Sequence, residues 1–139
     1  MRVILDTNAL LAALISPYAP PDIIYRAWRA RRFDLVTSAT QLDELRRVSR
    51  YPKLKAILPA HRIATMVNNM HRAIVLEELA ELPPSYQLDD PADAFLLAMA
   101  FAADADFLVT GDRKAGLLKL GHARRTRILT PSQFCAEVA

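Results

Sequence analysis

The longest apolar run of the sequence extends over ten residues, 94–103. It is too short to span a bilayer, which needs about 20 residues. A helix that is apolar on every side has to be covered by other parts of the protein on most of its surface. The run therefore predicts a buried helix inside a folded domain, and no membrane-spanning segment is expected.

The composition is that of a globular protein. The chain has 139 residues, of which 53% are hydrophobic and 24% charged, so we expect a single domain over residues 1–139. Its one cysteine, Cys135, cannot form an intrachain disulfide, and no Cys/His ladder for structural zinc is present. The start, MRVILDTN, reaches a carboxylate at once, so no secretory signal is expected. These features favour a cytoplasmic protein.

The net charge of +3 hides a strong segregation of charge along the chain. Residues 73–112 hold nine acids and no Lys or Arg, so the rest of the chain carries +12. The bases gather in three clusters, at 26–32, 46–55 and 113–127. Such clusters can bind a phosphate backbone, although a solvated basic helix surface explains any single cluster equally well.

Short apolar or β-branched runs alternate with helical patterns along the chain. We expect strands at 2–5, 33–37, 73–76, 107–109 and 127–129. Helices are expected at 9–15, 22–31, 38–50, 59–72, after Asp93 and after Pro131. Strands that alternate with helices imply a parallel sheet between helical layers. The predicted fold is a three-layer α/β/α domain with a central parallel sheet of about five strands.

Two acids, Asp6 and Asp112, come just past the ends of apolar strands. Parallel sheets bind their ligands at the carboxyl ends of the strands, so position alone makes both residues candidates for a site. Each also has a structural explanation. Asp6 can cap the helix that begins near Ala9, and Asp112 can belong to a turn after Gly111.

Three acids lie within five residues before the apolar helix, at Asp89, Asp90 and Asp93. A favourable interaction with the helix dipole explains Asp93 alone. Three neighbouring carboxylates repel one another, however, and a cation would relieve that repulsion. Glu44 belongs to a different helical stretch, where a surface pair with Arg47 is a sufficient explanation.

Four of these acids can converge at one end of the sheet although they are far apart in the sequence: Asp6, Glu44, Asp93 and Asp112. Carboxylate oxygens without His or thiolate suit Mg²⁺ or Mn²⁺, and Mg²⁺ leaves coordination positions for water and substrate phosphate. The chemistry that such a site favours is phosphodiester hydrolysis. An aspartate-nucleophile phosphatase is disfavoured, because Asn8 stands where a second Asp would be expected.

Four segments together carry a family resemblance. They are VILDTNALLAAL at 3–14, TSATQLDEL at 37–45, DDPADAFLLAMAFAADADFLVTGD at 89–112 and ILTPSQF at 128–134. Through them the chain resembles the PIN-domain nucleases, and particularly the prokaryotic PIN toxins related to the VapC class. The combination is specific, and it covers nearly the whole chain.

The resemblance implies roles for individual residues. Asp6, Asp93 and Asp112 are expected to ligate Mg²⁺ or Mn²⁺, with Glu44 as a further ligand of metal or water. The residues expected to support these ligands are Asn8, Ser38, Thr110 and Asp90. Related chains often have another acid shortly after the last aspartate, whereas this chain continues with Arg113 and Lys114. That departure argues against a second tightly held metal.

The resemblance also implies an activity. A PIN toxin of a type II toxin–antitoxin system is an endoribonuclease; metal-activated water attacks phosphorus and leaves a 5′ phosphate and a 3′ hydroxyl. Accessible, single-stranded or looped RNA is the expected substrate, and a homodimer and an antitoxin are the expected partners. Trp28, Phe33 and Tyr51 are possible contacts for an antitoxin, but each is better explained as a core aromatic. A PIN-fold module that binds RNA or a partner without turnover remains the alternative.

Overall fold

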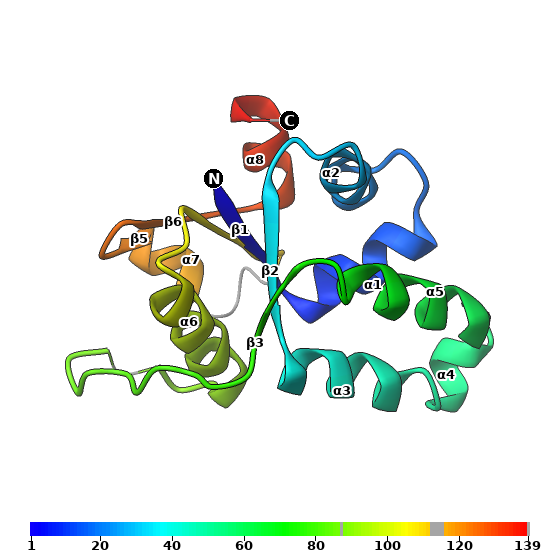
Figure 1. Cartoon of the computed structure of the whole chain (residues 1–139), viewed down its shortest axis with the longest axis horizontal. Helices are drawn as coiled ribbons and strands as arrows, with labels where there is room; N and C mark the ends of the chain where they lie inside the picture. The colour runs from blue at the N-terminus through cyan, green and yellow to red at the C-terminus, as the bar shows by residue number, and fades with distance from the viewer. Residues whose placement is uncertain (87, 112–115, 139) are drawn as a thin grey trace.

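One sheet organises the fold (Figure 1). The computed structural model describes residues 1–86, 88–111 and 116–138, and in them six strands are joined in the order β3-β2-β1-β4-β6-β5. The strands are β1 (Arg2–Leu5), β2 (Asp34–Ser38), β3 (Ile74–Leu76), β4 (Phe107–Val109), β5 (His122–Ala123) and β6 (Thr126–Leu129). All neighbouring pairs are parallel except β5 and β6. The predicted α/β class is confirmed.

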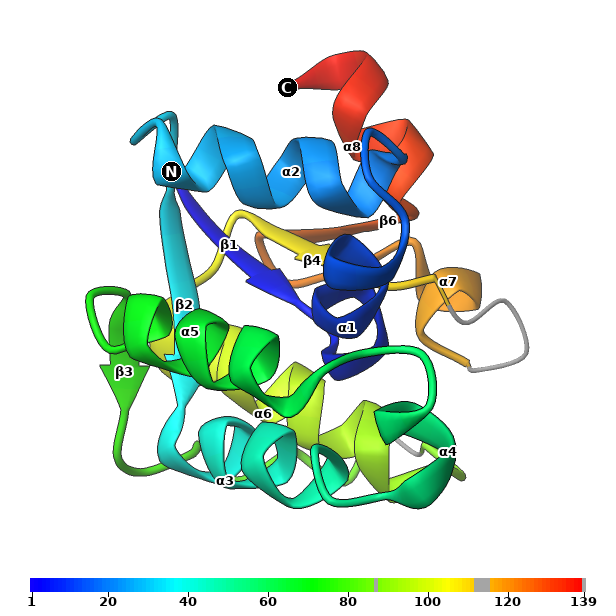
Figure 2. The same cartoon turned by 90° about the vertical axis from the view of Figure 1, so that its right-hand side faces the viewer.

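Helices cover both faces of the sheet (Figures 1 and 2). Helices α6 and α7 lie on one face, and α1, α2, α5 and α8 lie on the other. The helices are α1 (Thr7–Ile15), α2 (Pro20–Arg29), α3 (Ala39–Val48), α4 (Pro52–Lys55), α5 (Ala60–Met70), α6 (Pro91–Ala103), α7 (Leu117–Leu120) and α8 (Pro131–Glu137). The predicted three-layer arrangement is therefore present.

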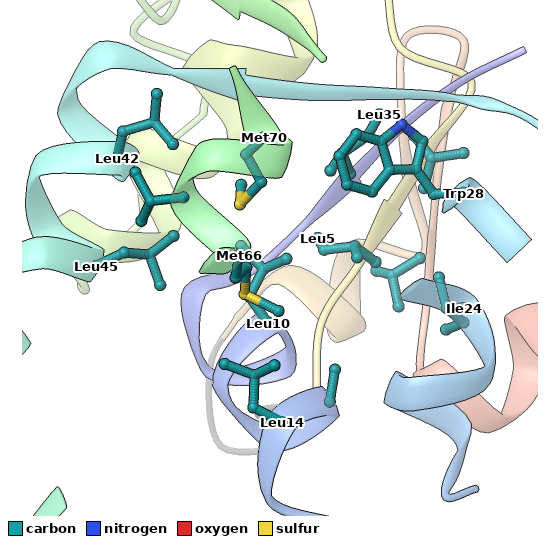
Figure 3. Close-up of a cluster of buried hydrophobic side chains, with 14 of the residues drawn as sticks. Leu5, Leu10, Leu14, Ile24, Trp28, Leu35, Leu42, Leu45, Met66 and Met70 are labelled. Atoms are coloured by element: carbon teal, nitrogen blue, oxygen red, sulfur yellow. The ribbon is translucent and has the colours of Figure 1, made fainter. Parts of the chain in front are cut away.

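Side chains of β1 alternate between two hydrophobic cores, as the pleat of a strand requires. Val3 and Leu5 belong to the core under α1, α2 and α5, and Ile4 belongs to the core under α6. Figure 3 shows the first core, where Met66 and Met70 of α5 meet leucines of α1 and β1. Both methionines fill the core, since they are at most 1% exposed.

Helix α6 is buried along most of its length, as its apolar run predicts. Leu97, Met99 and Ala100 are fully buried, and Leu96 and Phe101 are at most 7% exposed. Side chains of α7, of the sheet and of the loop before α6 together cover it. Among the described helices none is both long and apolar enough to cross a membrane.

The structure adds three short elements that the sequence analysis did not predict, namely α4, α7 and β5. Helices α4 and α7 are single turns of four residues, and no residue of α4 is buried. Strand β5 has two residues and makes the sheet six-stranded in place of about five, with one antiparallel edge. Elements this short carry no hydrophobic periodicity, because a pattern needs a longer window to repeat.

Candidate active site

The site lies where the connections of the sheet diverge. Strand β1 is followed by helices that lead to β2 on one side, whereas β4 continues to β6 on the other side. In open α/β sheets the crevice for a ligand forms at such a switch point, outside the carboxyl ends of the strands. Asp6 directly follows β1, and Thr110 directly follows β4.

Asp6 has two structural roles at this point. One carboxylate oxygen accepts a hydrogen bond from the backbone N–H of Ala9 and thereby caps α1, as one interpretation of the sequence predicts. The other oxygen accepts hydrogen bonds from the Thr110 hydroxyl at 2.6 Å and from the Gly111 N–H at 3.3 Å. The residue is only 5% exposed, so its carboxylate is held in one orientation.

A cavity of about 340 Å³ opens beside Asp6. It brings together six of the eight predicted site residues: Asp6, Asn8, Glu44, Asp90, Asp93 and Thr110. Asp6 and Thr110 directly follow β1 and β4, and Asp90 directly precedes α6. The other three residues lie on α1, α3 and α6. Segments that are far apart in the sequence therefore meet at one place, as the carboxylate pattern suggests.

Asp90 and Asp93 have different roles at the start of α6. Asp90 is the N-cap, and its carboxylate accepts the N–H of Ala92 at 2.9 Å. Asp93 lies in the first turn, is 5% exposed, and accepts the N–H of Gly116 at 3.2 Å. Since Asp90 supplies the cap, the carboxylate of Asp93 extends to the cavity in the favourable field of the helix N-terminus.

Glu44 reaches the cavity from α3. Its carboxylate accepts a hydrogen bond of 3.4 Å from the Thr7 hydroxyl. The described structure contains no ion pair between Glu44 and Arg47; the ion pair of α3 joins Arg46 to Asp43 at 3.1 Å. The alternative explanation of Glu44 as a surface partner of Arg47 is therefore wrong in this structure.

Ser38 lies behind the cavity and does not line it. Its hydroxyl caps α3 by accepting the N–H of Gln41 at 3.1 Å, and it lies 3.7 Å from the sulfur of Met99. It holds the start of α3, the helix that carries Glu44.

Gln41 is a supporting residue that the sequence analysis missed. It is fully buried, and its side-chain amide donates to the backbone carbonyl of Leu5 at 2.9 Å and accepts from the Thr37 hydroxyl at 2.7 Å. Leu5 directly precedes Asp6, so Gln41 ties α3 to the end of β1. The available signal was the S-x-x-Q sequence from Ser38 to Gln41, which has the form of a capping box. Here the Gln side chain spans to the neighbouring strand in place of closing that box.

The carboxylates suit a hard divalent cation by their chemistry. Asp6 and Asp93 are both buried and both reach the cavity, and Glu44 lies on its wall. Within residues 1–86, 88–111 and 116–138 no three His, Cys, Asp or Glu side chains come close enough to form a complete metal site. The fourth predicted ligand, Asp112, lies outside the described residues, as do Arg113 and Lys114. The donors that are described fit such a cation in their chemistry, and two of them, Asp6 and Asp93, are buried.

The comparison with known families assigns the chain. A family model described as PIN domain matches residues 2–114, which is most of the chain and includes every predicted ligand. In a comparison with curated proteins, none matches the chain. The chain belongs to the PIN-domain family, whose members are generally nucleases and typically depend on divalent metal ions. The resemblance seen in the sequence is confirmed at the level of this family.

Proposed function

We propose that this protein is a Mg²⁺- or Mn²⁺-dependent endoribonuclease and the toxin of a type II toxin–antitoxin system. The observation that carries the nuclease proposal is the convergence of two buried carboxylates, Asp6 and Asp93, with Glu44 at one cavity. Carboxylates gathered at the switch point of a parallel sheet have the donor chemistry and the position of a metal-dependent phosphodiesterase site.

A divalent cation held by Asp6, Asp93 and Asp112 would neutralise charge on the scissile phosphate and lower the pKa of a water molecule. Glu44 orients this water and accepts its proton. The Thr110 hydroxyl and the Gly111 N–H fix the carboxylate of Asp6. The water oxygen bonds to phosphorus and the bond from phosphorus to the 3′ oxygen breaks. That oxygen takes a proton from solvent water and leaves as a hydroxyl, and Glu44 returns its proton to solvent.

RNA as substrate is supported by the sequence resemblance to prokaryotic PIN toxins and by the distribution of charge. The chain outside residues 73–112 carries +12, and such a surplus of positive charge attracts a polyanion. Such a toxin would act in the cytoplasm, as a homodimer, and under control by an antitoxin. Trp28 and Phe33 are core residues, at 8% and 6% exposed, whereas Tyr51 is 50% exposed and accessible to a partner.

The direct test compares the wild-type protein with Asp6→Asn on end-labelled single-stranded RNA in Mg²⁺, Mn²⁺ or EDTA. Asn caps a helix about as well as Asp, so this variant keeps α1 and removes the charge. We expect cleavage by the wild type that EDTA abolishes, loss of cleavage in the variant, and products with 5′ phosphate and 3′ hydroxyl ends.

Several outcomes would contradict the proposal. Products with a 2′,3′ cyclic phosphate would show attack by the 2′ hydroxyl of the RNA and not by water. Equal cleavage by both proteins would identify a contaminating ribonuclease. RNA binding without turnover in either metal would favour the binding-module alternative. The dimer is tested separately by light scattering at micromolar concentration, where the mass of a single chain would exclude it.

A further inference from the structure

Phe95 differs from the other phenylalanines of the described structure in what its ring contacts. Phe33 and Phe107 each pack edge-on against Phe134, with ring centroids 5.7 and 5.4 Å apart, and Phe101 packs against Tyr86 at 5.2 Å. In the same described residues, Phe95 has neither an aromatic partner nor a guanidinium over its ring.

The position of Phe95 gives this difference a meaning. The side chain is half-buried and packs partly against the core around α6, and it also lines the cavity that contains Asp93. Pro91 and Leu96 line the cavity beside it and make this wall apolar. An aromatic ring on an apolar wall next to carboxylates provides a surface on which a planar group can stack.

Arg47 lies on another wall of the same cavity. Helix α3 brings Thr40, Glu44 and Arg47 to it, at spacings of four and three residues that define one helix face. Within the described lining, Arg47 is the one basic residue, and among the described ion pairs it has no carboxylate partner. Its neighbour Arg46 is engaged elsewhere, with Asp43 and, at 3.1 Å, with a ring nitrogen of His71.

We propose that Arg47 and Phe95 form a subsite for one unpaired nucleotide beside the carboxylates. Arg47 binds the phosphate of that nucleotide, and the ring of Phe95 stacks on its base. The cavity volume, about 340 Å³, lies at the lower end of the range of small-molecule sites. A base in a duplex is already stacked and paired, whereas an unpaired base can enter, and stacking accepts any base. The subsite rests on the proposed function and specifies its substrate as RNA with an unpaired nucleotide next to the scissile phosphate.

Binding tests the subsite independently of turnover. The dissociation constant of a fluorescein-labelled single-stranded RNA is measured by anisotropy in Ca²⁺, a larger oxygen-seeking cation that replaces Mg²⁺. We expect Phe95→Leu to bind about 5- to 150-fold more weakly, since base stacking on an aromatic is worth about 1–3 kcal/mol. Phe95→Tyr keeps the ring and should bind like the wild type. Phe101→Leu, on the same helix but away from the cavity, is the matched control and should bind like the wild type.

Arg47→Ala is tested in the same assay. We expect binding weaker by about 5- to 10-fold, with a slope of log affinity against log salt that is smaller by about 1. Arg46→Ala removes the same charge one residue away and should leave the affinity and the slope close to those of the wild type. Thermal melting of every variant verifies that it is folded.

A series of RNAs with one abasic position each locates the stacked base. At one abasic position, the wild type should bind more weakly than it binds the intact RNA, by the same factor by which Phe95→Leu weakens binding of the intact RNA. The affinity of Phe95→Leu should not change when this base is removed. A flat series, a Phe95→Leu protein that binds like Phe101→Leu, or a wild type that binds no RNA would each overturn the subsite. Binding with these features but no cleavage in Mg²⁺ or Mn²⁺ would contradict the nuclease and leave the subsite standing. Metal-dependent cleavage by the wild type, together with Phe95 and Arg47 variants that bind RNA like the wild type, would support the nuclease and contradict the subsite.

Discussion

The two ends of the sheet use aspartates in different ways. At the amino end, Asp106 precedes β4 and accepts the backbone N–H of Arg2 at 2.8 Å as well as the guanidinium of Arg125. At the carboxyl end, Asp6 and Asp93 are buried and open onto a cavity. An aspartate beside a salt-bridge partner at the edge of the fold joins strands together, whereas aspartates that share a cavity are placed to bind a third group.

The helix directions contribute to this difference. Helices α1, α3 and α6 all begin at the carboxyl end of the sheet, where Asp6, Ser38 and Asp90 cap them. Their partly positive N-termini therefore gather around the acids. Helices α2 and α5 end at the other side, where Arg29 and Arg72 line a second cavity of about 420 Å³ near their last turns. The two cavities thus differ in charge, since acids predominate in the lining at the carboxyl end and arginines in the lining at the amino end.

The largest effect is expected from the acidic end. Asp93→Asn removes one of the two buried carboxylates, and since loss of a residue that merely supports a metal ligand costs about 10- to 100-fold, we expect RNA cleavage to fall by at least about 100-fold. The free energy of unfolding should change by no more than about 1 kcal/mol, the usual size of a helix-dipole interaction. Both are measured on one preparation, by RNA cleavage and by urea denaturation. A variant that keeps its activity but loses most of its stability would make Asp93 a structural residue and remove the contrast with Asp106.

A smaller loss of activity is expected when the support of Asp6 is removed. Thr110→Val keeps the shape of the side chain and deletes the hydroxyl that lies 2.6 Å from the Asp6 carboxylate. We expect metal-dependent cleavage to fall about 10- to 100-fold, with partial recovery at high Mg²⁺ concentration. Titration of cleavage rate against Mg²⁺ measures this. Unchanged half-saturation by Mg²⁺ would show that the hydroxyl does not tune the site.

Gln41 supports the acidic end by hydrogen bonds alone, so its loss should appear mainly as stability. Gln41→Leu leaves the Leu5 carbonyl and the Thr37 hydroxyl without this partner in the core, which costs about 1–3 kcal/mol of unfolding free energy. Gln133→Leu, at an exposed helix cap, is the control and should cost less. Adding Thr37→Val to Gln41→Leu should recover part of the loss, and a double variant with strictly additive losses would argue against this network.

The smallest effect is expected at the amino end. The N–H of Arg2, followed by the guanidinium of Arg125, lowers the pKa of Asp106 below its usual value. A lowered pKa in the folded state stabilises the protein above the unfolded-state pKa of about 3.9, and this stabilisation disappears as the pH falls through the folded value. Asp106→Asn should therefore reduce the unfolding free energy at pH 7 by about 0.5–1 kcal/mol.

Urea denaturation at a series of pH values from 7 downward measures the difference in unfolding free energy between the wild type and Asp106→Asn. It should shrink as the pH falls below about 3.9, and RNA cleavage at pH 7 should be unchanged. A difference that is the same at all pH values would show that the charge of Asp106 is not the cause. Loss of cleavage would break the distinction between the two ends of the sheet.

Sequence-based prediction was most accurate where the sequence pattern was long or tied to a strand end. The long apolar run predicted α6 and its burial, and the strand-end position of Asp6 predicted its place at the cavity. Gln41 was missed because its sequence neighbours suggest a local cap, while its contacts are made with β1. Ser38 was expected to support the ligands, but its place outside the cavity lining depends on how the start of α3 lies against Met99.

The sequence by itself determined the order of the longer strands and helices, the cap of α1 and the carboxylates that follow strands, because these depend on nearest neighbours and on periodicity. Only the tertiary structure decided that Arg47 and Phe95 line the same cavity as Asp6. They lie on α3 and α6, which pack into different hydrophobic cores, and no local pattern records the distance between two packed helices. That distance is set by how both helices pack against the sheet, since close packing in the cores fixes where each helix face ends up.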